Sequence, residues 1–195
     1  MNVLIILGHP NKKSFNHSIA ETCKEQIESN GHTVFFHDLY AENFNPLLHN
    51  VNANSNNSLD EQVKVHCNNL MKSDGIIIVH PNWWGQPPAI VKGWMDRVLL
   101  PGVAYDFVEN ENGEHTLIGL LKAQNAIIFN SSNSPYDKES DPLASIWKNS
   151  VFNFCGVKNI EQRNCCLVTD SDDNQRDKWL EEVQGIISTR FTKQP

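Results

Sequence analysis

Short, continuously apolar runs alternate along this chain with longer segments whose apolar residues follow helical spacing. The apolar runs are 3–7, 33–37, 75–79, 126–129 and a weaker one at 165–168. The segments with helical spacing are 16–29, 59–72, 88–99, 142–154 and 173–191. Runs that are continuously apolar, rather than alternating, are typical of parallel strands buried on both faces. The pattern therefore predicts an α/β domain with a doubly wound, five-stranded parallel sheet covered by helices.

The length of 195 residues suits one domain with a substantial core, so we expect 1–195 to fold as a single unit. For the strand order, the flavodoxin-like arrangement 2-1-3-4-5 is the first choice, and ligands of such sheets bind beyond the carboxyl ends of the strands. The Asn112-Gly113 pair predicts a small hairpin around 109–115. The Asn-rich stretch 48–57 is predicted to be a surface loop.

Charge and cysteine content narrow the class of protein. A net charge of −7 makes nucleic acid an unfavourable partner. The five cysteines are odd in number and form no C-x-x-C pair, and the histidines lack metal-ligand spacing, so we expect free thiols and no metal site. The first apolar run is too short for a signal peptide, and no run reaches membrane-spanning length. These features predict a cytoplasmic protein without membrane insertion.

The loop after the first apolar run combines a glycine, a histidine, two lysines and a hydroxyl directly before a helix. It reads Gly8-His9-Pro10-Asn11-Lys12-Lys13-Ser14-Phe15-Asn16. Unpaired backbone N–H groups at a helix N-terminus favour a bound anion, and Ser14, Asn16 and His9 could add bonds to a phosphate. Ser14 or Asn16 could equally be an ordinary helix cap. The loop matches neither the Walker A nor the G-x-G-x-x-G pattern, yet it favours a nucleotide as ligand.

A second candidate loop follows the third apolar run, at the same predicted edge of the sheet. Its residues are Pro81, Asn82, Trp83, Trp84 and Gly85. Two adjacent tryptophans in a loop punctuated by Pro and Gly are difficult to bury, and such a surface suits a flat heterocycle. The alternative is that both indoles pack beneath the loop as part of the core.

Two motifs carry a resemblance to a known family. They are H-P-x-x-x-S-F-N after the first strand, and W-W-G-x-P-P-A-I-V-K-G-W-M-D-R-V-L-x-P-G-x-A-Y-D-F after the third. In both, the chain resembles the flavodoxin-like NAD(P)H:quinone oxidoreductases, which include bacterial quinone reductases and ancillary reductases of potassium-efflux systems. The likeness covers about residues 1–121, with a weaker continuation to 168.

The resemblance implies a flavin, FAD or alternatively FMN, that takes hydride from NADH or NADPH and passes two electrons to a quinone in a ping-pong reaction. It places the flavin phosphates at His9, Ser14, Phe15 and Asn16. It places the ring system against Pro81, Asn82, Trp83, Trp84 and Gly85. Relatives also have a Thr-Thr-Gly-Gly turn at the flavin edge, where this chain has Asn130, Ser131, Ser132 and Asn133. Asn tolerates left-handed backbone and could preserve that turn.

The resemblance also implies an acid–base pair, a Tyr and a His, that stabilises charge on the reduced flavin. Tyr136 matches the Tyr and is the predicted catalytic residue, but no histidine follows His115. By analogy the protein is expected to be a homodimer. The alternatives are a flavodoxin-type electron carrier, a reductase of azo or nitro compounds, and a regulatory subunit of a membrane transporter.

Overall fold

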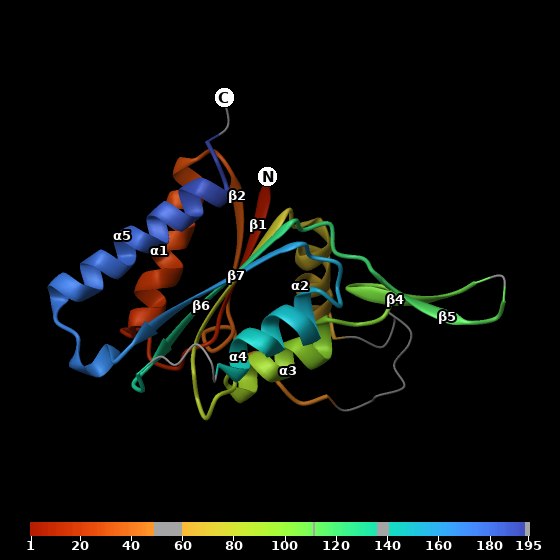
Figure 1. Cartoon of the computed structure of the whole chain (residues 1–195), viewed down its shortest axis with the longest axis horizontal. Helices are drawn as coiled ribbons and strands as arrows, with labels where there is room; N and C mark the ends of the chain where they lie inside the picture. Colours follow the sequence, from red (N-terminus) through yellow and green to blue (C-terminus); the bar gives the residue numbers. More distant parts are fainter. Residues whose placement is uncertain (49–59, 111, 136–140, 194–195) are drawn as a thin grey trace.

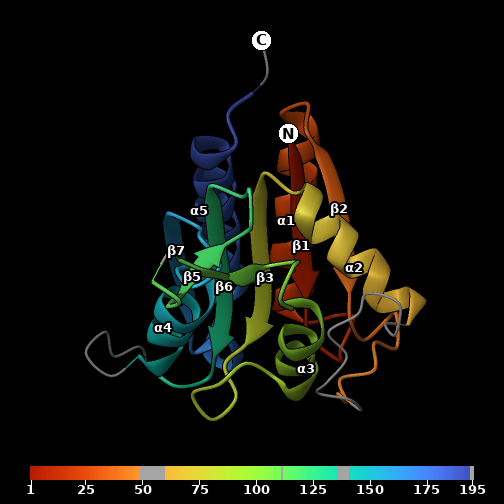
Figure 2. The ribbon, with the colours of Figure 1, turned by 90° about the vertical axis from the view of Figure 1, so that its right-hand side faces the viewer.

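The computed structural model describes residues 1–48, 60–110, 112–135 and 141–193. Its centre is a five-stranded parallel sheet with the order β2-β1-β3-β6-β7, which is the predicted arrangement 2-1-3-4-5 counted along the chain (Figures 1 and 2). The strands are β1 Asn2–Leu7, β2 Thr33–Asp38, β3 Gly75–Pro81, β6 Asn125–Ser132 and β7 Asn159–Cys166. The predicted fold class is therefore confirmed.

Helices cover both faces of this sheet (Figure 1). One face carries α1 Phe15–Ser29 and α5 Asp173–Arg190; the other carries α2 Glu61–Lys72, α3 Ala89–Val98, α4 Pro142–Ser145 and the π-helical segment η2 Ile146–Phe152. In β1, Val3, Ile5 and Leu7 join the core under α1 and α5, while Leu4 and Ile6 join the core on the other face. Successive side chains of a strand point to opposite faces of the sheet. Because helices cover both faces, every buried residue of β1 must be apolar, which explains the continuous apolar run.

The weakest strand prediction, 165–168, is wrong in position. Strand β7 spans Asn159–Cys166, Leu167 takes a left-handed conformation with φ 57°, and the short 3₁₀ segment η3 Val168–Asp170 follows. Because β7 is an edge strand and most of its residues are only half-buried, its sequence is polar. The predicted helix 142–154 is likewise divided into α4 and η2.

The other predicted helices are confirmed within a few residues at their ends. Helix α2 begins at Glu61 because the Asp60 side chain caps it, with Oδ1 accepting from the Val63 N–H at 2.8 Å. The loop predicted at 48–57 lies outside the described residues except for Leu48.

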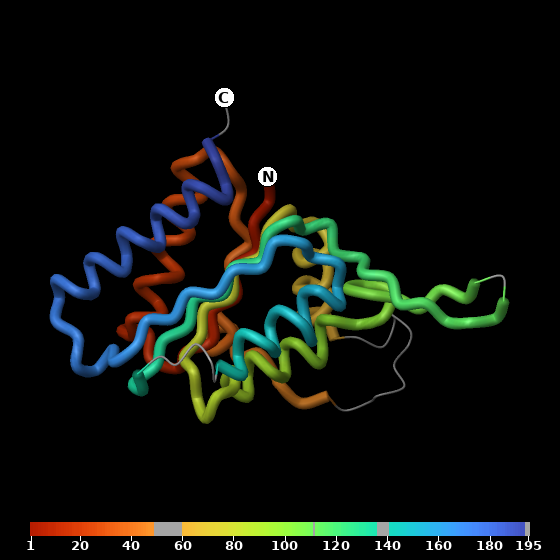
Figure 3. The backbone as a smooth tube through the Cα atoms, viewed as in Figure 1, coloured from red at the N-terminus to blue at the C-terminus, as the bar shows by residue number. Residues whose placement is uncertain are grey.

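The predicted hairpin is present and extends away from the rest of the molecule (Figures 1 and 3). It consists of β4 Tyr105–Glu109 and β5 His115–Gly119 in antiparallel pairing. Phe107, Val108 and Ile118 expose between about a third and half of their surface there.

The five cysteines are free thiols and four of them are buried, as the sequence predicted. Within the described ranges, no helix combines the length and the apolar character needed to cross a bilayer.

Helix α3 crosses the chain at Pro46 so closely that only glycine fits at position 93. A Cβ atom at Gly93 would lie 2.3 Å from Pro46 Cβ and 2.4 Å from its backbone. We expect Gly93→Ala to lower the free energy of unfolding by about 1–3 kcal/mol, measured by urea denaturation. Gly185→Ala in α5 is the matched control, because no atom lies within 4 Å of its added methyl group. The control should gain up to about 1 kcal/mol from helix propensity; equal losses in both variants would contradict the steric explanation.

Candidate functional site

The two candidate loops meet at one edge of the sheet. Leu7 at the end of β1 pairs with Val79 of β3, and Pro81 at the end of β3 pairs with Ser131 of β6. The loops after β1, β3 and β6 therefore leave the sheet side by side (Figure 2). This is the point where the strand order reverses, which in doubly wound sheets is the usual place for a ligand.

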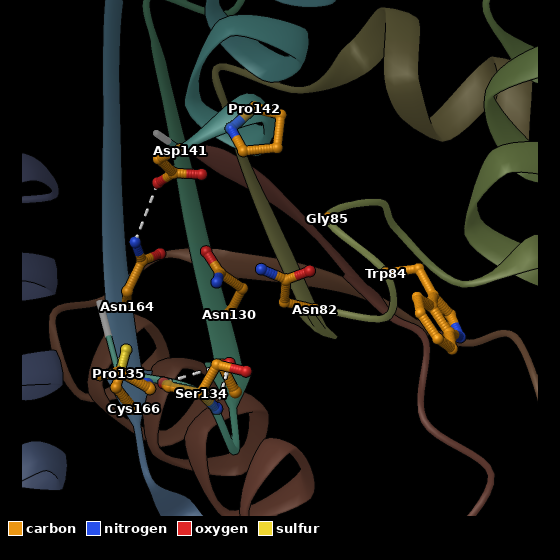
Figure 4. A pocket seen from close by; sticks show the side chains of 11 residues that line it. Asn82, Trp84, Gly85, Asn130, Ser134, Pro135, Asp141, Pro142, Asn164 and Cys166 are labelled. Atoms are coloured by element: carbon orange, nitrogen blue, oxygen red, sulfur yellow. Dashed lines mark hydrogen bonds between the residues drawn. The ribbon is translucent and has the colours of Figure 1, made fainter. Parts of the chain in front are cut away.

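Two adjoining pockets lie at this edge. The first, the helix pocket, has a volume of about 350 Å³ and lies at the start of α1. It is lined by His9, Ser14, Phe15, Asn16, Pro81, Asn82, Trp83, Ser131, Ser132, Asn133, Ser134, Val168 and Thr169. The second, the amide pocket, has a volume of about 480 Å³. It is lined by Asn82, Trp84, Gly85, Asn130, Ser132, Ser134, Pro135, Asp141, Pro142, Asn164 and Cys166 (Figure 4). Asn82, Ser132 and Ser134 border both pockets, so the two form one groove.

Every described residue of the predicted flavin site lines this groove. The exception in the predicted site is Tyr136, the predicted catalytic residue, which lies outside the described residues.

Neither Ser14 nor Asn16 caps α1 with its side chain. Ser14 occupies the N-cap position with extended backbone, but its hydroxyl makes no capping bond. Asn16 lies inside the helix, is 2% exposed, and donates from Nδ2 to the Ser131 hydroxyl at 2.8 Å. Its Oδ1 is buried with no hydrogen-bond partner among the described residues. A buried acceptor without a donor costs free energy, so the helix pocket offers an acceptor to a ligand.

The tryptophan loop is a tight turn held by two backbone bonds. Trp83 N–H donates to the Gln86 carbonyl at 3.0 Å, and Gln86 N–H donates to the Trp83 carbonyl at 3.1 Å. Trp84 and Gly85 between them have φ values of 58° and 72°. The turn places Trp84 at the border of the amide pocket, on the opposite side from Asp141 and Asn164 (Figure 4), and leaves it 101% exposed, with Trp83 42% exposed. The alternative of two core indoles is therefore wrong, and Trp84 is held in a left-handed conformation that is unusual for a bulky residue.

His80 and Trp147 anchor the base of this loop. The fully buried His80 donates from Nδ1 to the Pro81 carbonyl at 2.8 Å, and its Nε2 accepts from Trp147 Nε1–H of η2 at 3.0 Å. Burial lowers the pKa of His80 to about 4, so the ring is neutral near pH 7. Sequence reasoning did not single out this pair, although His80 opens the recognised motif.

Asn130, Asp141 and Asn164 form one wall of the amide pocket, and Gln162, which does not itself line the pocket, bonds to all three. Gln162 Nε2 donates to Asn130 Oδ1 at 2.9 Å and to Asp141 Oδ2 at 3.0 Å, and Asn164 Nδ2 donates to Asp141 Oδ2 at 3.0 Å. The other Asp141 oxygen accepts from the backbone of α4. Sequence reasoning missed Asp141, Gln162 and Asn164 because it misplaced β7, which carries two of them. This wall offers amide groups and one carboxylate to a ligand.

Residues 130–133 do not form the left-handed turn that the sequence suggested. Asn130, Ser131 and Ser132 belong to strand β6, and none of residues 130–133 has a positive φ. Beyond the strand, Ser132 Oγ accepts from the Ser134 N–H at 2.9 Å.

One group of side chains away from the groove has a metal-binding composition. His37, Glu42 and His66 place donor atoms within 4.8 Å of one another. Trp94 Nε1–H, which can only donate, bonds His66 Nδ1 at 3.1 Å, so His66 Nε2 carries the proton that reaches Glu42 at 3.0 Å. Burial favours neutral Glu42, but hydrogen bonds from both histidines outweigh it and hold its pKa at about 2. With its proton in place, His66 Nε2 has no lone pair for a metal, and the group is a network joining β2, α2 and α3.

Comparisons with known proteins agree with this architecture. A family profile described as "Flavodoxin-like fold" matches residues 1–186. An uncharacterized NAD(P)H oxidoreductase of Haemophilus influenzae is 40% identical, over 98% of this chain and 96% of the relative. NAD(P)H dehydrogenase (quinone) 1 of Rattus norvegicus is 26% identical, over 98% of this chain and 78% of the relative. The solved NAD(P)H:quinone oxidoreductase of Methanothermobacter marburgensis is 25% identical with a TM-score of 0.78, covering 96% of this chain and 95% of that structure.

Proposed function

The chain belongs to the flavodoxin-like family that includes NAD(P)H:quinone oxidoreductases, and from this membership we propose that it is a flavin-dependent enzyme that reduces quinones with NAD(P)H. The observation that carries the proposal is the single groove formed by the loops after β1, β3 and β6. A groove at the reversal of strand order, bounded by a helix N-terminus and by an indole face, suits a ligand with phosphates and a planar ring.

The residues of the groove fit a flavin in chemical type. Asn16 Oδ1 is a buried acceptor that lacks a donor, and Trp84 presents a fully exposed aromatic face. The residues that would hold the phosphate portion are His9, Ser14, Phe15 and Asn16. Those that would bind the ring and its polar edge are Pro81, Asn82, Trp83, Trp84, Gly85, Asn130, Ser131, Ser132 and Asn133.

When bound, the flavin supplies the redox chemistry, taking hydride from NADH or NADPH and passing two electrons to the acceptor in ping-pong order. The chain orients the ring and controls its electrostatic surroundings. Tyr136 remains the proposed catalytic residue. No histidine is among the residues that line the amide pocket in the described ranges, so amide groups would contact the ring edge there. Uncharged donors on Asn82 and Asn130 could stabilise negative charge without a titrating group.

The decisive experiment identifies the cofactor and then tests turnover. The purified protein is heated, and the released chromophore is identified by mass, which separates FAD from FMN. We expect NADH or NADPH to bleach the yellow protein and a quinone to restore the colour over many turnovers. Bleaching without quinone turnover would favour an electron carrier, and tight nucleotide binding with negligible turnover would favour a regulatory subunit of a transporter. Azo and nitro compounds are compared in the same assay, since a flat acceptor is selected mainly by shape. A colourless protein that binds neither FAD nor FMN would overturn the proposal.

A homodimer is also part of the proposal. It is supported by the β4–β5 hairpin, which extends from the body of the molecule (Figure 3). Phe107, Val108 and Ile118 of this hairpin are exposed. Apolar side chains on an extended two-stranded ribbon are a common mark of a protein interface. Sedimentation analysis of the intact protein and of Phe107→Ser tests this: a monomeric intact protein would contradict it.

A further inference from the structure

A chain of hydrogen bonds leads from the helix pocket into the molecule through three side chains. Ser14 Oγ lies 2.9 Å from His17 Nδ1, and His17 Nε2 lies 3.1 Å from Asp38 Oδ2. Ser14 and His17 are one turn apart on α1, whereas Asp38 ends the neighbouring strand β2. The side chains of His17 and Asp38 are only 15% and 14% exposed. Only Ser14 of the three lines the helix pocket.

The direction of each bond follows from Asp38. Its second oxygen, Oδ1, accepts from the N–H groups of Tyr40 and Ala41, both at 3.1 Å. A carboxylate only accepts, so His17 Nε2 must carry a proton and donate it to Oδ2. In a neutral His17, Nδ1 is then an acceptor, and the Ser14 hydroxyl must donate its proton inward to it. The serine then presents only lone pairs to the pocket.

A protonated His17 reverses the last bond. Nδ1–H then donates to Ser14 Oγ, and the hydroxyl proton is free to turn into the pocket. An anion there would gain a charge-assisted donor at Ser14 and a nearby positive charge. An anion at this position is favoured independently by the start of α1, where the Ser14 hydroxyl makes no capping bond. A second sign of a ligand is Asn16, which is 2% exposed and lines the pocket with an unpartnered Oδ1; this acceptor suits a hydroxyl or N–H donor of the ligand beside the anion, not the anion itself.

We propose that Ser14, His17 and Asp38 form a proton relay that couples binding of a phosphate-type anion in the helix pocket to protonation of His17. The proton comes from solvent, and no bond other than those to hydrogen changes. The inference rests on the proposed function only in taking the flavin phosphate as the natural anion. His17 and Asp38 are positioning residues, because they act on the ligand through Ser14.

The groups that surround His17 support this assignment. Besides Asp38 from β2, the His9 ring from the β1–α1 loop faces it edge-on with ring centres 6.3 Å apart. Burial lowers the pKa of His9, so its surroundings favour the neutral form of this neighbour. On α1 itself, Glu21 lies one turn further along and pairs with Lys24 at 3.6 Å. Lys12 and Lys13 belong to the same loop as His9 and are exposed, so they add positive charge to this loop rather than a competing base.

The test counts protons by calorimetry. FMN, riboflavin and inorganic pyrophosphate are titrated at pH 7.5 into protein freed of bound flavin, in two buffers with different ionisation enthalpies. Because the relay requires a protonated His17 when the anion is bound, we expect the intact protein to take up more protons on binding FMN or pyrophosphate than His17→Gln does. Riboflavin, which lacks the phosphate, should show no such difference.

His17→Gln keeps a donor for Asp38 and an acceptor for Ser14 but cannot be protonated, and its thermal unfolding verifies the fold. Its affinity for FMN should be about tenfold lower at pH 6, with riboflavin affinity unchanged. Glu21→Gln, a change at a charged neighbour outside the pocket, is the control and should retain the extra proton. Equal proton uptake by intact protein and His17→Gln would overturn the relay alone. Relay-dependent binding of pyrophosphate without any flavin binding would overturn the proposed function alone. Failure of FMN, FAD and pyrophosphate to bind would overturn both.

Discussion

Lowering the pH from 6.5 to 4 is expected to remove about 3 kcal/mol of unfolding free energy through His80 alone. In the folded protein His80 is fully buried, and this burial lowers its pKa from 6.5 to about 4. In the unfolded chain it takes up a proton from about pH 6.5 downwards. The unfolded state therefore binds more protons throughout this window, and stability falls as the pH falls. Below about pH 4 the folded state is protonated as well, and the loss through this group is complete.

Urea denaturation at pH 7 and pH 4.5 measures the effect, with His80→Gln as the comparison. Glutamine can still accept from Trp147 Nε1–H but does not titrate. The change in unfolding free energy between pH 7 and pH 4.5 should therefore be smaller in His80→Gln than in the intact protein, by about 2–3 kcal/mol. Carboxylates whose pKa is lowered in the folded protein, such as Glu42, also reduce the free energy of unfolding in acid. They do so in the intact protein and in His80→Gln alike, so their contribution cancels when the two pH profiles are subtracted. Parallel pH profiles would show that His80 is not the cause. Trp147→Phe tests the bond between the two side chains directly, because it leaves the buried Nε2 of His80 without a donor. We expect it to lower the free energy of unfolding by about 1–3 kcal/mol at pH 7.

The central sheet could be predicted because its strands are buried on both faces. Ile5 and Ile6 point to opposite cores, so neither position admits a polar residue and the run is unmistakable. Strand β7 lacks this constraint. Gln162 and Asn164 meet Asp141 at the amide pocket, while Arg163 between them reaches Glu182 of α5 at 2.8 Å. A strand with polar partners on both faces has no apolar signal, so the sequence predicts a strand only at its apolar end, 165–168.

The groove itself could be predicted, but its internal bonding could not. Parallel strands bring their carboxyl ends together, so loops following β1 and β3 had to meet. The sequence shows that Ser14 and His17 are three residues apart, which brings them together on one side of a helix. It does not show that Asp38 lies beside them, because that position depends on the pairing of Leu7 with Asp38 between β1 and β2. The exposure of Trp84 depends on turn geometry, which composition does not specify.

Trp84→Ala is expected to weaken flavin binding about tenfold to a hundredfold while leaving the fold intact. Stacking of a planar base on an aromatic side chain is worth about 1–3 kcal/mol, which corresponds to this range of affinity. The indole is 101% exposed, so its removal uncovers no core and should change the unfolding free energy by less than about 0.5 kcal/mol. A large aromatic residue at φ 58° without contacts is difficult to explain as a stabilising feature. We therefore infer that the indole serves a ligand rather than the fold.

Three variants separate the role of the ring from that of the turn. Trp84→Phe keeps an aromatic face and should retain most of the affinity. Trp84→Ala removes the face, and Trp84→Gly removes it while also relieving the left-handed backbone, which should raise the unfolding free energy by up to about 1 kcal/mol. Visible absorbance of the purified proteins and fluorescence titration with FMN and FAD give the affinities, and sedimentation establishes whether the subunit state changes with them. Unchanged absorbance in Trp84→Ala would exclude stacking. If Trp84→Ala instead lost the dimer and kept its flavin affinity, the indole would belong to the subunit interface. Its exposed face beside the groove would then be covered by a second copy of the chain.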